Sequence, residues 1–227
     1  FKNQSREAFR KYEGKRFTWQ QTVMLEAYNR GIHTFEQDSF DMAKRWLSAR
    51  SGRGIGKTGT MAVIAIHFLF CFPGAQIAMT ANTEQQVQDV FMKEFAIWKA
   101  KLPEFMQLCL VQTADHIRME DSEDWFLRAQ VARPENTQAL AGLHGEYMLI
   151  IVDECSGITN SRVFETMKGS LTGENYFVGY WGNPTDNEGE FADSQLKLGL
   201  PYTRLHFSSR ESPIVKPGFI EKMEADY

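Results

Sequence analysis

The apolar positions of this chain fall into two kinds of run, which alternate along the sequence. Short apolar or alternating runs, typical of strands, lie at 45–50, 75–80, 148–152, 176–181 and 203–208. Longer runs, with the length or the spacing of helices, lie at 19–30, 60–72, 83–101 and 161–168. Strands that alternate with helices predict an α/β domain with a mostly parallel central sheet flanked by helices.

The pattern also predicts where some elements begin, end or pair. Thr18 is expected to cap the helix at 19–30, and Gly31 is expected to end it. The segments 105–112 and 125–131 are expected to be strands, which could pair as a hairpin or a ribbon at the edge of the sheet. The polar, glycine-bearing segment 132–146 is expected to be a loop.

A glycine-rich string joins the first predicted strand to the long apolar helix and has the spacing of a phosphate-binding loop. Its expected nucleotide-binding residues are Ser51, Gly52, Arg53, Gly54, Ile55, Gly56, Lys57 and Thr58. The glycines allow successive amides to point inward at an anion, and the helix that follows adds its positive end. Lys57 would reach the β- and γ-phosphates, and the Thr58 hydroxyl would ligate Mg²⁺. Ser51 stands where the usual pattern has glycine; the alternative is a chance glycine-rich turn.

Polar residues follow two later strands, where open α/β sheets place their ligands. The run 148–152 is wholly apolar, as in a strand buried on both faces, and it ends in Asp153 and Glu154. Asp153 is expected to hold Mg²⁺, and Glu154 is expected to orient and deprotonate the attacking water. Asn183 follows the strand at 176–181 and would face the γ-phosphate. Alone, the acidic pair suits a helix cap and the Gly-Asn-Pro sequence suits a turn.

Composition limits the number of domains and the class of protein, but it does not identify a partner. With 227 residues the chain suits one domain, and its formal net charge of -4 provides no global basic field, although a local patch can still contact DNA. Cys71, Cys109 and Cys155 have no paired spacing, so they are interpreted as core thiols in a reducing compartment. The apolar run at 60–72 is too short to span a membrane.

Several stretches, taken in order, resemble the ATPase domain of the large terminase subunits of tailed bacteriophages. They are SGRGIGKT at 51–58, the strand and turn at 75–83, GLHG at 142–145, IIVDECSGI at 150–158 and GNPTDNEGEF at 182–191, with Trp19-Gln20 and LHFSSRESP at 205–213 in addition. The resemblance covers about 17–213 and implies an α/β P-loop NTPase fold of the ASCE/RecA-like class. It also implies ATP and Mg²⁺ as cofactors, and hydrolysis that drives double-stranded DNA through the portal into a procapsid.

The resemblance carries over to individual positions. It implies catalytic roles for Glu154, Lys57 and Arg53, metal ligation by Thr58 and Asp153, recognition of adenine by Gln20 and coupling of hydrolysis to movement by Asn183. On residue chemistry alone, Gln20 is expected to face solvent. An arginine from a neighbouring subunit commonly completes such sites; the candidates are Arg128, Arg133 and Arg162.

The implied organisation is an arm at 1–16, the ATPase domain at 17–208 and a linker at 209–227 that leads toward a nuclease domain outside this chain. Nuclease activity is therefore not expected here. The implied partners are double-stranded DNA, contacted through its backbone, the portal protein, the small terminase subunit and further copies in a ring, in the cytoplasm of the infected host. The alternatives are a helicase-like or other nucleic-acid-stimulated ATPase, a nucleotide-gated binding module and a small-molecule kinase.

Overall fold

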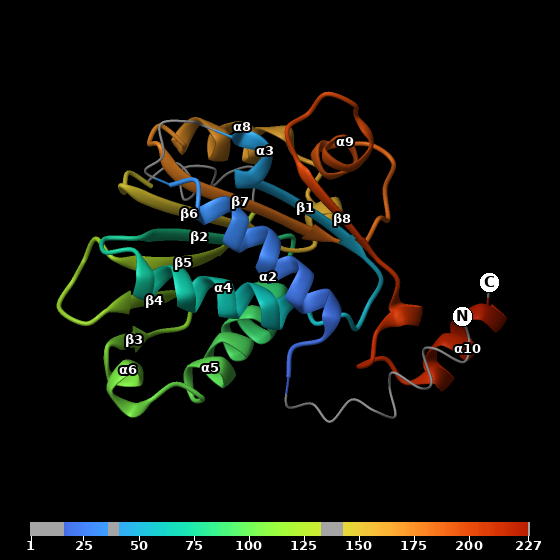
Figure 1. The fold of residues 1–227 in the computed structure, drawn as a ribbon, viewed down its shortest axis with the longest axis horizontal. Helices are drawn as coiled ribbons and strands as arrows, with labels where there is room; N and C mark the ends of the chain where they lie inside the picture. Colours follow the sequence, from blue (N-terminus) through green and yellow to red (C-terminus); the bar gives the residue numbers. More distant parts are fainter. Residues whose placement is uncertain (1–15, 36–40, 133–142, 227) are drawn as a thin grey trace.

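The computed structural model describes residues 16–35, 41–132 and 143–226, and its centre is an eight-stranded sheet (Figure 1). The strands are β1 (Trp46–Ser51), β2 (Gln76–Ala81), β3 (Leu110–Gln112), β4 (His116–Met119), β5 (Phe126–Val131), β6 (Tyr147–Val152), β7 (Asn175–Gly182) and β8 (Thr203–Phe207). Their order is β3-β4-β5-β2-β6-β7-β1-β8. The pairs from β5 to β8 are parallel, and only β3-β4 and β4-β5 are antiparallel. The predicted α/β class is confirmed.

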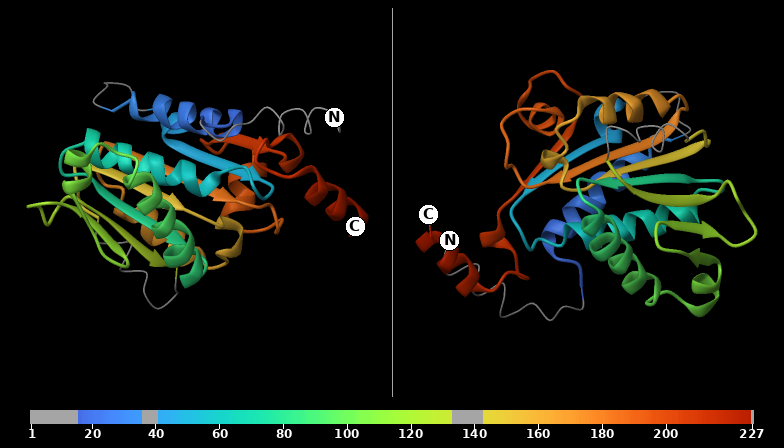
Figure 2. Two further views of the ribbon diagram at one scale, coloured as in Figure 1. Left: turned by 90° about the horizontal axis from the view of Figure 1, so that it is seen from below. Right: turned by 180° about the vertical axis from the view of Figure 1, so that it is seen from behind.

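Helices cover both faces of this sheet. They are α2 (Trp19–Ile32), α3 (Met42–Arg45), α4 (Lys57–Cys71), the π-helical segment η1 (Gln86–Met92), α5 (Lys93–Lys99), α6 (Glu104–Leu108), α8 (Ser161–Ser170), α9 (Glu190–Leu196) and α10 (Pro217–Asp226). One core cluster packs α2, α4 and α5 against one face, and a second packs α8 and α9 against the other (Figures 1 and 2). Among the described residues, no helix is long and apolar enough to cross a bilayer.

The strand order brings three predicted motifs to one edge of the sheet. Strand β7 lies between β1, which leads into the glycine-rich loop, and β6, which leads into the acidic pair. Because the three strands are parallel, their carboxyl ends lie at the same edge.

The edge of the sheet differs from the predicted hairpin. Most of 105–112 is helix α6, and only its last residues form β3; the unpredicted strand β4 pairs with both β3 and β5. Pro103, with φ of -53°, starts α6, and the acidic Glu104 in its first turn favours a helix start. Phe105 and Leu108 are 70% and 67% exposed. The strand was predicted from apolar side chains that are not buried in the structure.

The first helix begins where predicted but does not end there. Thr18 caps α2, since its hydroxyl accepts the N–H of Gln21 while the Gln21 side chain accepts the N–H of Thr18. The helix continues through Gly31 to Ile32. A Cβ atom on Gly31 would lie 2.5 Å from a ring carbon of Phe177. Gly31 is therefore needed for close packing of α2 on β7, not for ending the helix.

Candidate functional site

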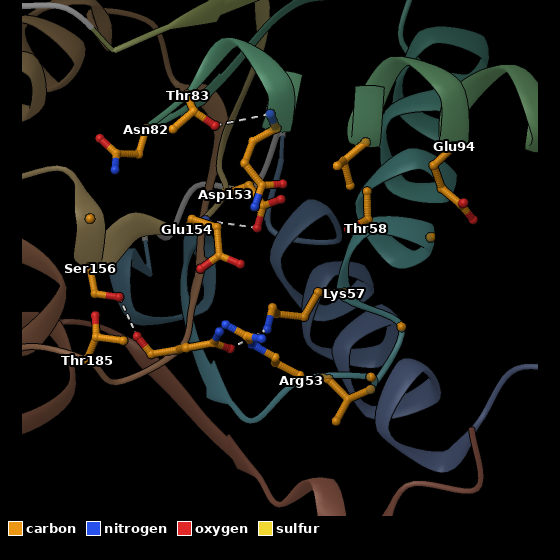
Figure 3. Close-up of a pocket in the computed structure, with 18 of the residues that line it drawn as sticks. Arg53, Lys57, Thr58, Asn82, Thr83, Glu94, Asp153, Glu154, Ser156 and Thr185 are labelled. Carbon is orange, nitrogen blue, oxygen red and sulfur yellow. Dashed lines mark hydrogen bonds between the residues drawn. The ribbon is translucent and has the colours of Figure 1, made fainter. Parts of the chain in front are cut away.

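A cavity of about 790 Å³ opens at the carboxyl edge of the sheet, where the loops after β1, β2, β6 and β7 meet (Figure 3). Its lining includes most of the residues singled out from the sequence: Arg53, Gly54, Ile55, Gly56, Lys57, Thr58, Asp153, Glu154 and Asn183. The structure thus brings together residues that lie up to about 130 positions apart in the chain. Parallel strands explain this, because each strand delivers its following loop to the same edge.

The glycine-rich loop has the geometry of an anion site. Gly54 and Gly56 have φ of +72° and +83°, a left-handed conformation that glycine adopts without a steric penalty. The Ile55 side chain between them is 1% exposed and anchors the loop in the core. Helix α4 begins directly at Lys57. Consecutive turns of this kind, followed by a helix start, direct backbone N–H groups toward one point.

Lys57 is held by polar atoms from two strands. Its Nζ donates to Oδ1 of Asn183 at 2.9 Å, to Oγ of Ser51 at 3.0 Å and to the carbonyl of Gly52 at 3.4 Å. Ser51, the departure from the usual glycine, therefore contacts the lysine directly. Burial lowers the pKa of Lys57, and the nearby negative charges of Glu154 and Asp153 oppose that shift.

The acidic pair lies at the end of β6, as expected. Asp153 is 2% exposed, and its pKa is raised to about 6, first by burial and then by the charge of Glu154. One Asp153 oxygen accepts the N–H of Glu154 at 2.9 Å. Glu154 itself has a left-handed backbone conformation with φ of +46°, which is unusual for a residue other than glycine. Such conformations cluster at functional sites.

The oxygen donors at the cavity suit Mg²⁺. Thr58 and Asp153 both line it, and their hydroxyl and carboxylate oxygens are the ligand type that Mg²⁺ prefers. In the part of the chain that the structure describes, no group of three or more His, Cys, Asp or Glu side chains is placed so that it could hold a metal ion. A donor set this small fits Mg²⁺, which keeps several waters and usually shares its coordination with substrate phosphates.

Asn183 joins the two motifs through its backbone as well as its side chain. Its carbonyl accepts a hydrogen bond from the hydroxyl of Ser156, which follows the acidic pair. Ser156 was not identified from the sequence. Asn82 and Thr83, directly after β2, also line the cavity, and polar residues at a strand end were a sequence signal for them. Glu94 and Ile214 line it without any such signal.

The glutamine expected at the nucleotide is not at the cavity. Gln20 is 0% exposed, and neither polar atom of its amide has a hydrogen-bond partner among the described residues. The cavity is lined instead by Gln21, whose amide donates to the carbonyl of Gly56 at 3.3 Å. The side chains of successive helical residues point about 100° apart, so Gln20 and Gln21 face different surroundings and only Gln21 meets the loop. Both glutamines are buried, and the expectation that Gln20 faces solvent is wrong.

The four arginines differ in their placement. Arg53 lines the cavity. Arg128 lies in β5 over the ring of Phe126, and Arg162 lies at the exposed start of α8, so neither belongs to the cavity lining. Arg133 falls outside the described residues.

Comparisons with known proteins agree with this geometry. No protein-family model matches the chain. The probable large terminase subunit of Enterobacteria phage P7 is 31% identical over 225 residues, which cover 94% of this chain and 43% of that protein. The chain therefore spans less than half the length of that relative.

Two solved structures share the fold. The large terminase of a thermophilic bacteriophage superposes with a TM-score of 0.67 at 13% identity, over 94% of this chain and 51% of that chain. The large terminase ATPase domain of Thermus phage P74-26 does so with a TM-score of 0.55 at 15% identity, over 89% of both chains. The resemblance inferred from the sequence motifs is thus confirmed: this chain is related to the large terminase subunits of bacteriophages and has the P-loop fold of their ATPase domains.

Proposed function

We propose that this chain is an ATPase domain whose hydrolysis of ATP drives the packaging of double-stranded viral DNA into a procapsid. The observation that carries the proposal is the convergence on one cavity of the loop lysine Lys57, the carboxylates of Asp153 and Glu154, and Asn183. The sequence relation to the phage P7 large terminase subunit supports the same function. The large terminase of the thermophilic bacteriophage has itself been solved with ADP and with ATP-γ-S.

The residues divide the work of hydrolysis. The loop amides and Lys57 hold the β- and γ-phosphates, while Thr58 and Asp153 would hold Mg²⁺, which would neutralise phosphate charge. Glu154 orients a water molecule in line with the γ-phosphorus and accepts its proton as the new P–O bond forms. The bond from the γ-phosphorus to the bridging oxygen breaks, and ADP and inorganic phosphate leave.

Two further side chains respond to the γ-phosphate. Asn183 accepts a hydrogen bond from Lys57, so a γ-phosphate that also binds this lysine would change the restraint on the end of β7. That is a physical route from hydrolysis to movement. Arg53 projects from the loop beside Lys57 and adds positive charge at the cavity (Figure 3). Recognition of the base falls to the start of α2, where Gln21 and not Gln20 reaches the cavity.

The same proposal includes the partners that a packaging motor requires. They are double-stranded DNA held through its phosphates, the portal protein, the small terminase subunit and further copies of this chain in a ring, in the host cytoplasm. An arginine from a neighbouring copy would complete the site, with Arg128 and Arg162 as the described candidates. DNA contacts through phosphates would weaken steeply with salt. No nuclease activity is assigned to this chain.

The test compares wild type with Lys57→Ala and Glu154→Gln, with and without double-stranded DNA. Glu154→Gln should bind ATP within about 3-fold of wild type but lose turnover by about 100-fold or more, because it keeps its shape and loses the base. Lys57→Ala should bind ATP at least about 10-fold more weakly. The exposed Glu165→Gln and Lys93→Ala are matched controls and should behave as wild type.

The outcomes separate the alternatives. Turnover that DNA stimulates, without strand separation in a duplex-unwinding assay, supports the motor. Strand separation would indicate a helicase, and nucleotide binding without hydrolysis a binding module. Glu154→Gln that turns over like wild type would overturn the catalytic assignment.

A further inference from the structure

The end of β8 and the chain that follows it contact the phosphate loop at three consecutive residues. The carbonyl of Phe207 accepts the N–H of Gly52 at 3.2 Å. The hydroxyl of Ser209 donates to the carbonyl of Arg53 at 2.7 Å, and that of Ser212 donates to the carbonyl of Gly54 at 2.7 Å. We call residues 207–215 the loop brace.

These two hydroxyls fix the direction of two peptide groups. A peptide unit is planar and trans, so its C=O and N–H point in opposite directions. When the Arg53 carbonyl points outward to Ser209, the N–H of the same peptide, which belongs to Gly54, points inward. Ser212 likewise sets the N–H of Ile55. Gly54 and Ile55 both line the cavity, which agrees with N–H groups that point away from the loop brace and toward bound phosphate.

The loop brace fits the loop closely and is itself held in place. A Cβ atom on Gly54 would lie 2.5 Å from Cγ2 of Val215, so the Val215 side chain packs against the Gly54 backbone in space that a larger residue would need. Ser212 is 1% exposed. The indole N–H of Trp19 donates to the carbonyl of Glu211 at 3.2 Å. The Trp19 ring also packs edge-on against the ring of Phe207, with 5.6 Å between the ring centroids. Helix α2 therefore supports the loop brace from the other side.

We propose that Ser209 and Ser212 are positioning residues of the ATP site, which orient the phosphate-binding amides of Gly54 and Ile55. The proposal rests on the proposed function, because it concerns how that site binds phosphate. In this proposal the loop brace contributes to nucleotide affinity by orienting the amides, a contribution separate from those of the glycine-rich string and the acidic pair. The loop brace is followed by α10, which projects away from the sheet (Figure 1).

The test measures ADP affinity and steady-state turnover for Ser209→Ala, Ser212→Ala and the double variant. Each single change should raise the Kd for ADP by about 3- to 10-fold, the scale of one lost hydrogen bond, and the double change by about 10- to 100-fold. KM for ATP should rise in parallel while kcat stays within about 2-fold, because ground state and transition state lose the same contact. Ser209→Thr keeps a hydroxyl and should restore affinity.

Controls distinguish this role from a general loss of structure. Ser161→Ala, at the exposed start of α8, should leave Kd, KM and melting temperature unchanged. If the double variant does not fold, the two single variants decide, since each removes one hydroxyl. Wild-type ADP affinity in both single variants would overturn the inference while leaving the ATPase proposal intact. Wild type that binds no ADP, or Lys57→Ala that binds it normally, would instead overturn the proposed function.

Discussion

Nζ of Lys57 donates a hydrogen bond to Oδ1 of Asn183 at 2.9 Å, which joins the phosphate loop to the tip of a strand 126 residues later. This contact exists because β7 lies beside β1 in the sheet. Under the proposed function, this contact places a neutral acceptor beside the lysine that binds the γ-phosphate, so we expect Asn183 to distinguish ATP from ADP.

Replacement of Asn183 by Ala should therefore reduce turnover more than nucleotide binding. We expect kcat for ATP to fall by about 100-fold, the scale of one lost polar contact to a transition state, and the Kd for ADP to stay within about 3-fold. Stopped-flow binding of ADP and steady-state phosphate release measure the two quantities. An equal loss of ADP affinity would place Asn183 at the β-phosphate instead.

The two glutamines at the start of α2 should behave in opposite ways. Gln20 has a buried amide without a described partner, so Gln20→Leu should raise stability by about 1–2 kcal/mol and leave ADP affinity unchanged. Gln21→Ala removes part of the capping box and the contact to Gly56, so it should lower stability by about 1 kcal/mol and weaken nucleotide binding. Chemical denaturation and ADP titration test both; weaker ADP binding by Gln20→Leu contradicts the assignment.

Gly54 should resist substitution for two separable reasons. Its φ of +72° costs a side-chain residue about 1–2 kcal/mol, and a Cβ atom would collide with Val215. Gly54→Ala should therefore weaken ADP binding and lower the melting temperature. Adding Val215→Ala should recover part of the loss by removing the collision and leave the part due to φ. Full recovery in the double variant would show that backbone strain contributes nothing.

Asp153 should destabilise the metal-free protein at neutral pH. Burial, and then the charge of Glu154, raise its pKa to about 6 in the folded protein, above the ordinary value of 3.8. The folded state thus holds the proton more tightly, so its stability falls as pH rises from about 4 to about 6, by roughly 3 kcal/mol in total. Above about pH 6 the loss of stability due to Asp153 stays constant, and below about pH 4 it disappears.

Asp153→Asn removes this ionisation and keeps an oxygen that can accept the N–H of Glu154. In the presence of a chelator it should be more stable than wild type at pH 7.5 and equal to it at pH 4, by denaturant titration at both values. It should also lose ATP turnover, because the metal ligand is gone. A stability difference that does not change with pH would show that ionisation of Asp153 is not its cause.

Much of this protein follows from local pattern. The wholly apolar run at 148–152 predicted a strand buried on both faces, and the spacing of the glycines before Lys57 predicted a turn of the kind that binds anions. Strands in alternation with helices then left few arrangements other than a parallel sheet with its ligand site at one edge. The fold class, the terminase resemblance and the residues of the phosphate loop and acidic pair could therefore be inferred before any contact was known.

Other features depend on contacts between distant segments, which local pattern does not contain. The placement of β7 between β1 and β6 brings Asn183 to Lys57, and the rotation of α2 against the sheet selects Gln21 over Gln20. The raised pKa of Asp153 arises from burial beneath other elements. The loop brace reaches the phosphate loop because β8 pairs with β1. Its two serines donate to backbone carbonyls, and since every residue has such a carbonyl, the sequence does not indicate these contacts. The sequence by itself determined most of the elements and the chemistry of the two main motifs, and tertiary packing decided the edge of the sheet and which side chains meet.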